Sequence, residues 1–283
     1  MQKEDTPKLD EADDRGHDTE KVSSVWASVY DRRGERVHRP HWIIKEQPVS
    51  LFLNGRELVT LLCAGHHLEE LAAGFLYGEG FLQHREDLTR LEVDQVERKV
   101  DVEVSGDASL PDKLWMKRTI TSGCGKGSLF YYALDALLSK PVKSTLRITP
   151  EQVLGRVEDL NRLSETYKRT HGVHNTALAT PWEILLFRDD IGRHNAVDMI
   201  VGHSFLNSVA LEDKLLLTTG RLTSEILIKA AKVGIPVLVS RNTATTLAIE
   251  LALSLNITLI GYARAGKFTV YSGEERVYGH IPG

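Results

Sequence analysis

Cysteine is almost absent from this sequence. The 283 residues include only Cys63 and Cys124. Two cysteines cannot build a disulfide framework, and such low usage is typical of proteins from a reducing compartment. A chain of this length can bury a full core without cross-links. We therefore expect about two domains, or one large one, stabilised by packing.

The sequence also lacks a long apolar run. No stretch reaches the roughly 20 residues that a membrane-spanning helix needs. The first residues, MQKEDTPKLDEADDRG, contain no apolar segment of the kind found in signal peptides. Apolar residues make up 42% and charged residues 26% of the chain, as is usual for soluble globular proteins. These features predict a cytoplasmic protein.

An excess of positive charge is missing as well. The formal net charge is -4, and residues 1–21 alone hold eight acidic and four basic side chains, which also gives -4. The rest of the chain is therefore neutral, which argues against broad nucleic-acid binding. Because residues 1–21 contain almost no apolar side chains, we predict that they form a disordered acidic tail.

Residues 22–142 are predicted to form an α+β region. VWASVYDRRGERVHR predicts two short strands around a turn. VSLFLNGRELVTLLC predicts a hairpin that turns at Asn54-Gly55, because both residue types tolerate a positive φ. HHLEELAAGFLYGEGF predicts an amphipathic helix, and LEVDQVE and KVDVEVS predict two further strands. The region also contains TSGCGKGS, whose glycines and serines indicate a loop.

Residues 143–283 alternate apolar strands with helices. A helix is expected to begin at Thr149-Pro150-Glu151, because threonine suits the N-cap and proline suits the first turn. The apolar segments ILLF, KLLL and PVLVS each lead through a polar loop into a helix, and ITLIGYA leads through RAGK into a last strand, FTVYS. This alternation predicts a layered α/β domain with a largely parallel, buried sheet.

The loops that follow these apolar strands are polar and cationic. Ligands of open α/β sheets bind beyond the carboxyl ends of the strands, and helix N-termini attract anions. A shared cationic bias in four loops favours a phosphorylated or nucleotide-containing ligand over ordinary N-caps and solvated arginines. Asn195 and Asp198 resemble a capping pair at one of the helices. The loop residues are Arg193, His194, Arg221, Thr223, Ser224, Arg241, Asn242, Thr243, Arg264 and Lys267.

Cys124 is the candidate nucleophile. Gly123 and Gly125 leave its sulfur accessible, and the neighbouring Lys126 favours the thiolate. From the local sequence alone, a reactive cysteine and an inert loop cysteine are equally good interpretations. Cys63 ends the apolar run LVTLLC and is predicted to be a core residue.

The segment THGVH contains two histidines three residues apart. His171 and His174 could share a metal ion if they were helical, and His174 could also act as an acid or base. No cysteine pair completes a metal-binding set, so we favour packing and backbone hydrogen bonding for both. We predict no metal site.

Taken together, these segments resemble the formate dehydrogenase accessory sulfurtransferase family, FdhD/NarQ, from about Val49 to Tyr271. The matching segments occur in order. They are VSLFLNGRELVTLL, LEELAAGFLYGEGFL, TSGCG, THGVHNTAL, DDIGRHNAVDMIVG, which is the most specific, and the run from TTGRLTSE to FTVYS.

The resemblance implies a cytidine-deaminase-like α/β fold, usually in a homodimer. It implies that Cys124 accepts persulfide sulfur from a cysteine desulfurase. The sulfur would pass to the molybdenum cofactor, bis-molybdopterin guanine dinucleotide, for insertion into formate dehydrogenase. The segment that matches the family's cofactor contact is Tyr262, Ala263, Arg264, Ala265, Gly266 and Lys267.

One position departs from the family pattern. A second cysteine often follows three residues after the first, but Gly127 stands there in this chain. A relay between two loop cysteines is therefore excluded, although one acceptor sulfur suffices for persulfide transfer. A non-catalytic chaperone that holds the cofactor remains an alternative, as does a nucleotide-binding regulator. A zinc-dependent deaminase is disfavoured because the sequence lacks the Pro-Cys-x-x-Cys segment that this chemistry needs, and its two cysteines are far apart.

Overall fold

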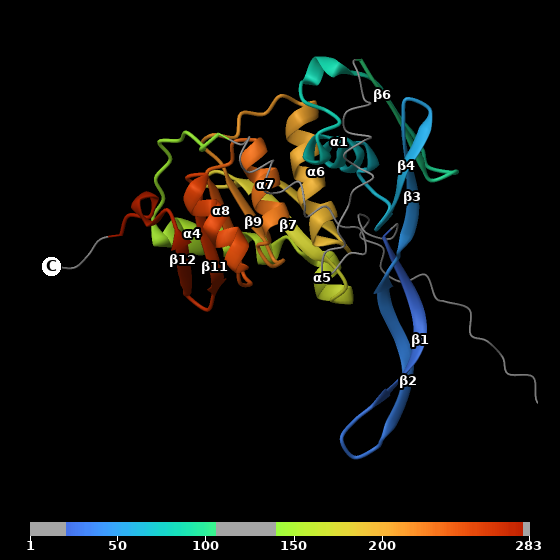
Figure 1. Cartoon of the computed structure of the whole chain (residues 1–283). Helices are drawn as coiled ribbons and strands as arrows, with labels where there is room; N and C mark the ends of the chain where they lie inside the picture. Colours follow the sequence, from blue (N-terminus) through green and yellow to red (C-terminus); the bar gives the residue numbers. More distant parts are fainter. Residues whose placement is uncertain (1–20, 106–139, 280–283) are drawn as a thin grey trace, which may run out of the picture.

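The computed structural model describes residues 21–105 and 140–279 (Figure 1). The predicted acidic tail at 1–21 lies outside these ranges except for its last residue, Lys21. The predicted cysteine loop, with Cys124, lies entirely outside them. Among the described residues, no helix is long and apolar enough to cross a membrane.

The first part of the chain forms a two-stranded hairpin and a four-stranded sheet. The hairpin consists of β1 (Val22–Tyr30) and β2 (Arg36–Ile44). It projects away from the rest of the molecule (Figure 1). The sheet has the order β4-β3-β6-β5. Its strands are β3 (Gln47–Leu53), β4 (Arg56–Cys63), β5 (Leu88–Asp94) and β6 (Lys99–Val104), with a short 3-10 helix, η1 (Arg85–Asp87), before β5.

The predicted turn at Asn54-Gly55 is confirmed. It joins β3 to β4, and both residues have a left-handed backbone, with φ of 48° and 77°. A two-residue turn with two positive φ angles matches the twist of the strands that it connects.

The predicted amphipathic helix is α1 (Leu68–Glu79), and it covers the four-stranded sheet. Leu68, Leu71 and Leu76 are each at most 2% exposed. They pack with the inward residues of β3 and β6, so the predicted apolar face is the buried one.

The second part of the chain is built on a six-stranded sheet of order β12-β11-β10-β9-β7-β8. The central strands β9, β10 and β11 are parallel, whereas β7 is antiparallel to both β8 and β9, and β12 is antiparallel to β11. The strands are β7 (His174–Ala179), β8 (Ile184–Asp190), β9 (Leu215–Thr218), β10 (Val237–Ser240), β11 (Thr258–Arg264) and β12 (Lys267–Ser272).

The prediction of a largely parallel sheet is therefore wrong in part, since the sheet is mixed. Its α/β character is confirmed. Only four residues, 180–183, separate β7 from β8, and a parallel crossover needs a dozen or more. The same holds for β11 and β12, which are joined through Ala265 and Gly266 alone.

Helices cover both faces of this sheet. On one face lie α6 (Arg193–Leu206), α7 (Ser224–Lys232) and α8 (Thr246–Ser254). On the other lies α4 (Pro150–Arg162). Successive strand residues alternate between the two cores: Leu216 and Leu238 face α6 to α8, while Leu217 and Val239 face α4. A short helix, α5 (Glu165–Thr170), precedes β7, and η2 (Glu274–Arg276) follows β12. Whether this layering is cytidine-deaminase-like stays a prediction.

The predicted start of α4 is confirmed in detail. The Thr149 hydroxyl accepts from the Gln152 amide at 3.2 Å, and the Gln152 side chain accepts from the Thr149 amide at 2.9 Å. This reciprocal pair satisfies two amide donors that the helix itself cannot. Pro150 occupies the first turn, as expected.

Helices α1 and α6 join the two parts of the molecule, and they cross at two glycines. A Cβ atom added to Gly74 of α1 would lie 1.8 Å from the Asp198 carbonyl oxygen. One added to Gly202 of α6 would lie 1.8 Å from the Glu70 carbonyl oxygen. The helix backbones therefore touch, and only glycine fits at either position. Met199 of α6 even packs into the core of the four-stranded sheet.

Candidate functional site

Of the two cysteines, Cys63 lies within the described residues and Cys124 does not. Cys124 lies outside the described residues, so its assignment as the sulfur carrier stays a prediction. Cys63 ends β4, is 0% exposed and forms no disulfide. Burial, and then the charge of Asp190, raise the pKa of its thiol to about 12. Cys63 is thus protonated at neutral pH and confirmed as a core residue.

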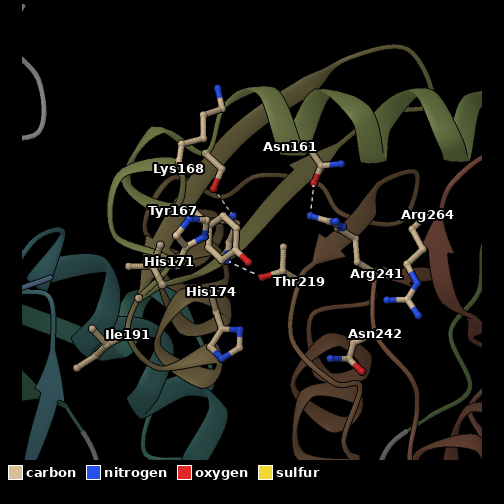
Figure 2. Close-up of a pocket in the computed structure, with 14 residues that line it drawn as sticks. Asn161, Tyr167, Lys168, His171, His174, Ile191, Thr219, Arg241, Asn242 and Arg264 are labelled. Atoms are coloured by element: carbon tan, nitrogen blue, oxygen red, sulfur yellow. Dashed lines mark hydrogen bonds between the residues drawn. The ribbon is translucent and has the colours of Figure 1, made fainter. Parts of the chain in front are cut away.

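The candidate site lies at one edge of the six-stranded sheet. Strands β8 to β11 all run toward this edge, and β7, which runs the other way, begins there. Beyond the edge is a cavity of about 780 Å³ (Figure 2). Its lining residues are Asn161, Ser164, Tyr167, Lys168, His171, Gly172, Val173, His174, Asn175, Ile191, Thr219, Arg241, Asn242 and Arg264.

The wall of this cavity is cationic. Lys168, Arg241 and Arg264 line it, and no carboxylate is found among the described lining residues. The Lys168 ammonium pairs with Glu165 at 2.6 Å, so the two arginines carry the positive charge of the wall. The Arg241 guanidinium donates to the Asn161 side-chain oxygen at 2.7 Å. That partner is neutral, so it orients the arginine without cancelling its charge. A cavity with this lining suits an anionic ligand such as a phosphate ester.

The backbone around the cavity is held by hydrogen bonds between neighbouring strand ends. The amide of Asn175 donates to the Thr219 hydroxyl, and the amide of Thr219 donates to the Asn175 carbonyl, both at 3.0 Å. The Asn175 side chain also donates to the Ser164 hydroxyl. These bonds fix the floor of the cavity to the end of α4 and the start of α5.

The segment Tyr262–Lys267 spans the end of β11 and the turn into β12, where Ala265 and Gly266 have φ of 51° and 71°. Of its six residues, only Arg264 is among the lining residues of the cavity. The side chain of Ala263 is 0% exposed and packs on the α4 side of the sheet. Contact from Ala263 to a ligand could therefore come only through its backbone. The cofactor-binding role of the segment stays a prediction.

Tyr262 itself has a left-handed backbone, with φ of 51°, and its amide donates to the Asn242 carbonyl at 2.9 Å. Its ring lies 5.6 Å from the Arg264 guanidinium carbon. The ring therefore supports the arginine at the mouth of the cavity.

His171 and His174 both line the cavity, but they do not share a helix. His171 follows the last residue of α5, and His174 begins β7. The helical spacing on which the metal interpretation depended is thus wrong. Burial, followed by the charges of Arg193, His194 and Arg221, lowers the pKa of His174. His174 is consequently neutral at physiological pH and able to donate one hydrogen bond and accept another.

The predicted capping pair at α6 is also wrong. Asn195 does not cap the helix: its side-chain amide donates to Asp190 at 2.7 Å and to the Leu62 carbonyl at 2.8 Å. Asp198 instead forms a buried ion pair with Lys229 of α7. Both side chains thus make polar contacts between different secondary-structure elements, which the local sequence could not show.

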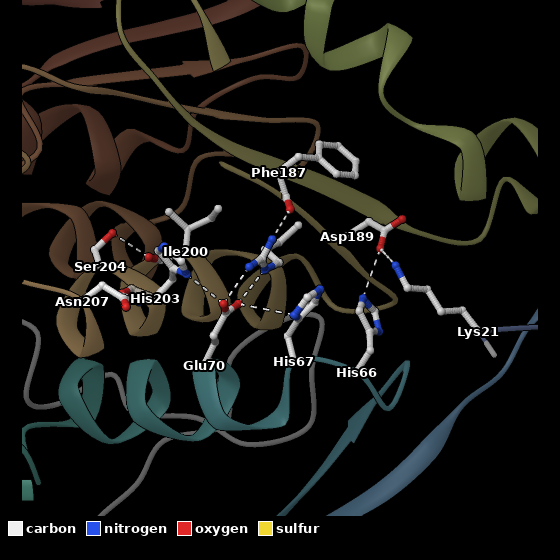
Figure 3. Close-up of polar contacts among 11 residues, drawn as sticks. Lys21, His66, His67, Glu70, Phe187, Asp189, Ile200, His203, Ser204 and Asn207 are labelled. Atoms are coloured by element: carbon white, nitrogen blue, oxygen red, sulfur yellow. Dashed lines mark hydrogen bonds and ion pairs between the residues drawn. The ribbon is translucent and has the colours of Figure 1, made fainter. Parts of the chain in front are cut away.

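A second polar cluster fastens the first part of the molecule to β8 and α6 (Figure 3). Arg188 of β8 donates to both oxygens of Glu70, at 2.5 and 2.6 Å, and His203 of α6 lies 2.9 Å from the same carboxylate. Beside them, Asp189 pairs with Lys21 at 3.0 Å and with His66 at 3.2 Å.

The two carboxylates of this cluster are ionised at neutral pH. Burial alone would raise the pKa of Glu70, but hydrogen bonds from Arg188 and His203 outweigh it and lower the pKa. Burial would likewise raise the pKa of Asp189, but the hydrogen bond from His66 and the charge of Lys21 hold it well below its usual range. Within the described part of the chain, the cluster has a structural role, because it holds the first part of the molecule to β8 and α6.

The chain is similar to curated proteins along most of its length. It is 42% identical to the protein named sulfur carrier protein FdhD from Bacillus subtilis (strain 168), over 90% of this chain and 97% of that protein. It is 39% identical to the protein of the same name from Bacillus licheniformis, over 88% of this chain and 94% of that one.

The fold is also found in a crystal structure. A protein from Desulfotalea psychrophila, proposed to be a formate dehydrogenase accessory protein, superposes with a TM-score of 0.75 and 25% identity, over 91% of this chain and all of that one. Residues 44–278 match the FdhD/NarQ family. Agreement in sequence, length and fold shows that this chain belongs to the FdhD/NarQ family.

Proposed function

We propose that this protein is a sulfurtransferase that carries persulfide sulfur on Cys124 from a cysteine desulfurase to the molybdenum cofactor, bis-molybdopterin guanine dinucleotide, for a formate dehydrogenase. It acts in the cytoplasm as a homodimer. The names of the relatives support the sulfur-carrier role. The observation that carries the ligand class is the cationic cavity, which Arg264 of the segment Tyr262–Lys267 enters.

Sulfur acceptance follows thiol–disulfide chemistry. The Cys124 thiolate attacks the outer sulfur of the desulfurase persulfide. The bond between the two persulfide sulfurs breaks, and the desulfurase cysteine leaves as a thiolate. No redox partner is needed, because one sulfur–sulfur bond replaces another. Lys126 favours the attacking form by its charge.

The cavity is suited to the dinucleotide part of the cofactor. Arg241 and Arg264 offer donors to phosphate oxygens, and Asn161 fixes the orientation of Arg241. Tyr262 supplies an exposed ring next to Arg264. Neutral Asn242 and Thr219 provide donors and acceptors that a base or a ribose can use.

Intact-mass analysis tests the carrier assignment. After incubation with a cysteine desulfurase and cysteine, the wild-type chain should gain the mass of one sulfur atom, and a reducing agent should remove it. Cys124→Ala should gain nothing, whereas Cys63→Ala should behave as wild type, because the Cys63 thiol is buried and protonated. Sulfur on Cys63 with Cys124 untouched would overturn the assignment.

The alternative is a chaperone that binds and delivers the cofactor without carrying sulfur. The glycine at position 127 favours it, since it removes a cysteine that relatives often have. The two functions separate in a strain that lacks the endogenous accessory protein. If the protein is a chaperone, the Cys124→Ala variant should restore formate dehydrogenase activity in this strain. If the protein is a sulfur carrier, the variant should not restore it.

A further inference from the structure

A second group of cations lies at the same edge of the sheet but does not line this cavity. It comes from the loops after β8 and β9, which lead into α6 and α7. Arg193 is the first residue of α6, and Arg221 lies three residues before α7. The side chains of His194 and Glu225 pair at 2.8 Å, so the N-termini of α6 and α7 are neighbours.

Arg193 is buried without a partner. It is 8% exposed, its Nε is buried without a hydrogen bond, and its side chain makes no hydrogen bond or ion pair with any other residue in 21–105 and 140–279. Its side chain runs against Gly220, where an added Cβ would lie 2.8 Å from the Arg193 Cβ. A buried charge is costly unless it is paired, so an unpaired guanidinium in this position points to an anion that occupies the site.

Three further features converge on the same place. Arg221 is exposed and is likewise unpaired with any described residue. The Thr223 hydroxyl, at the N-cap of α7, is buried without a hydrogen-bond partner. The positive ends of two helix dipoles, those of α6 and α7, meet here.

The nearby carboxylates do not neutralise this group. Asp190 accepts from the amides of Ala64 and Gly192 and from the Asn195 side chain, at 2.7 to 2.9 Å. Glu225 is paired with His194. Each carboxylate is already engaged by donors of its own, which leaves the two arginines unmatched.

We infer that the loops after β8 and β9 form a second oxyanion site, in which Arg193 and Arg221 hold a tetrahedral dianion beside His174. Three strand spacings separate Arg264, at the end of β11, from His174, at the start of β7. At about 4.8 Å each they give about 14 Å, too far for one phosphate to bridge. The second site therefore binds an anionic group of its own, which goes beyond the nucleotide site of the proposed function.

His174 reports on this site. Burial and the charges of Arg193, His194 and Arg221 lower its pKa, so a bound dianion should raise it. The experiment is an NMR titration of the His174 ring, assigned with His174→Gln, at fixed ionic strength. Sulfate is the probe, because its charge is constant over the titration, and chloride is the reference ion.

Matched variants locate the effect. Arg193→Gln should raise the His174 pKa without sulfate and abolish the response to sulfate. Arg193→Lys, which keeps the charge, should retain part of the response and shows that the fold tolerates the change. Arg264→Gln, at the far end of the cavity, should respond as wild type. No shift in the wild type, or equal shifts in wild type and Arg193→Gln, would overturn the inference.

Addition of GDP separates this inference from the proposed function. Saturating GDP should leave the sulfate response intact, and displacement of sulfate by GDP would overturn the independence of the two sites. Loss of GDP binding with the sulfate response preserved would reject only the nucleotide site. GDP binding without any sulfate response would reject only the second site.

Discussion

Arg264 and Lys267 face each other across the turn between β11 and β12, yet their surroundings differ. They are cross-strand partners, but only Arg264 lines the cavity. An arginine can grip phosphate oxygens through two parallel hydrogen bonds. A lysine outside the cavity can contribute only through its charge in solvent.

Arg264→Ala should therefore weaken GDP binding more than Lys267→Ala. We expect a loss of about 1.5–3 kcal/mol for Arg264→Ala, the range for hydrogen bonds to charged groups, and a smaller loss for Lys267→Ala. Calorimetric titration with GDP measures both. Equal losses in the two variants would show that the segment acts through net charge and not through the cavity.

Single residues were predictable where their chemistry is local. Thr149 and Pro150 mark the start of α4, and Cys63 ends an apolar run. Tyr167 and Lys168 were missed because α5 has only six residues, too few to show a helical period. Asn161 lies at the end of α4, where its sequence resembles any exposed helix end. Only the tertiary fold brings these residues to the cavity, so the sequence gives no local signal for them.

At the scale of elements, the crossing of α1 and α6 depends on two glycines. Gly74→Ala or Gly202→Ala would place a methyl group 1.8 Å from a carbonyl oxygen, so the helices must separate. We expect either change to lower the free energy of unfolding by about 3 kcal/mol, the upper end for overpacked sites.

Gly155→Ala is the matched control. Gly155 also lies inside a helix, α4, but an added Cβ would meet nothing within 4 Å. Alanine there should raise the free energy of unfolding by about 0.5–1 kcal/mol, because glycine is the poorer helix former. Urea denaturation of the three variants gives the comparison. Similar effects at all three positions would mean that helix propensity, not the close approach, governs them.

The direction and the neighbours of a strand could not be predicted from the local sequence. ILLF has the continuous apolar character of a buried parallel strand, and β8 does run parallel to β9 and β10. Among the described strands, however, its only hydrogen-bonded neighbour is β7, and the pair is antiparallel. The sequence HNTALA of β7 is apolar enough for a strand, but no local signal shows that it inserts between β8 and β9. Pairing over that distance is decided by the whole fold.

For the molecule as a whole, the cluster around Glu70 links stability to pH. His67 belongs to this cluster, since its Nδ1 lies 3.9 Å from the Glu70 carboxylate. Burial, and next the charge of Arg188, lower the pKa of His67 to about 4. The unfolded chain takes up this proton near pH 6.5, while the folded chain does not do so until about pH 4. The free energy of unfolding should therefore fall as the pH drops from about 6.5 to about 4.

The lowered pKa values of Glu70 and Asp189 act in the same direction at lower pH. Their contribution is present above the unfolded pKa of about 4 and is lost as the pH falls further. His67→Asn removes the contribution of His67 between pH 6.5 and 4, and asparagine accepts the left-handed backbone of this position, where φ is 50°. Denaturation between pH 6.5 and 4 should show a shallower decline for this variant, and an unchanged slope would contradict the assignment.

The arrangement of the cavity wall has a consequence for how this family can diversify. Nine of the fourteen lining residues in the described part of the chain fall in one run, from Asn161 to Asn175. That run joins the end of α4 to the start of β7, and only His174 and Asn175 of it belong to a strand of the sheet. Most of the wall is therefore encoded as a single uninterrupted block. Exchange of this segment between relatives would replace one side of the ligand pocket in a single step. Arg241 and Arg264 would be unchanged, because they lie at the ends of other strands.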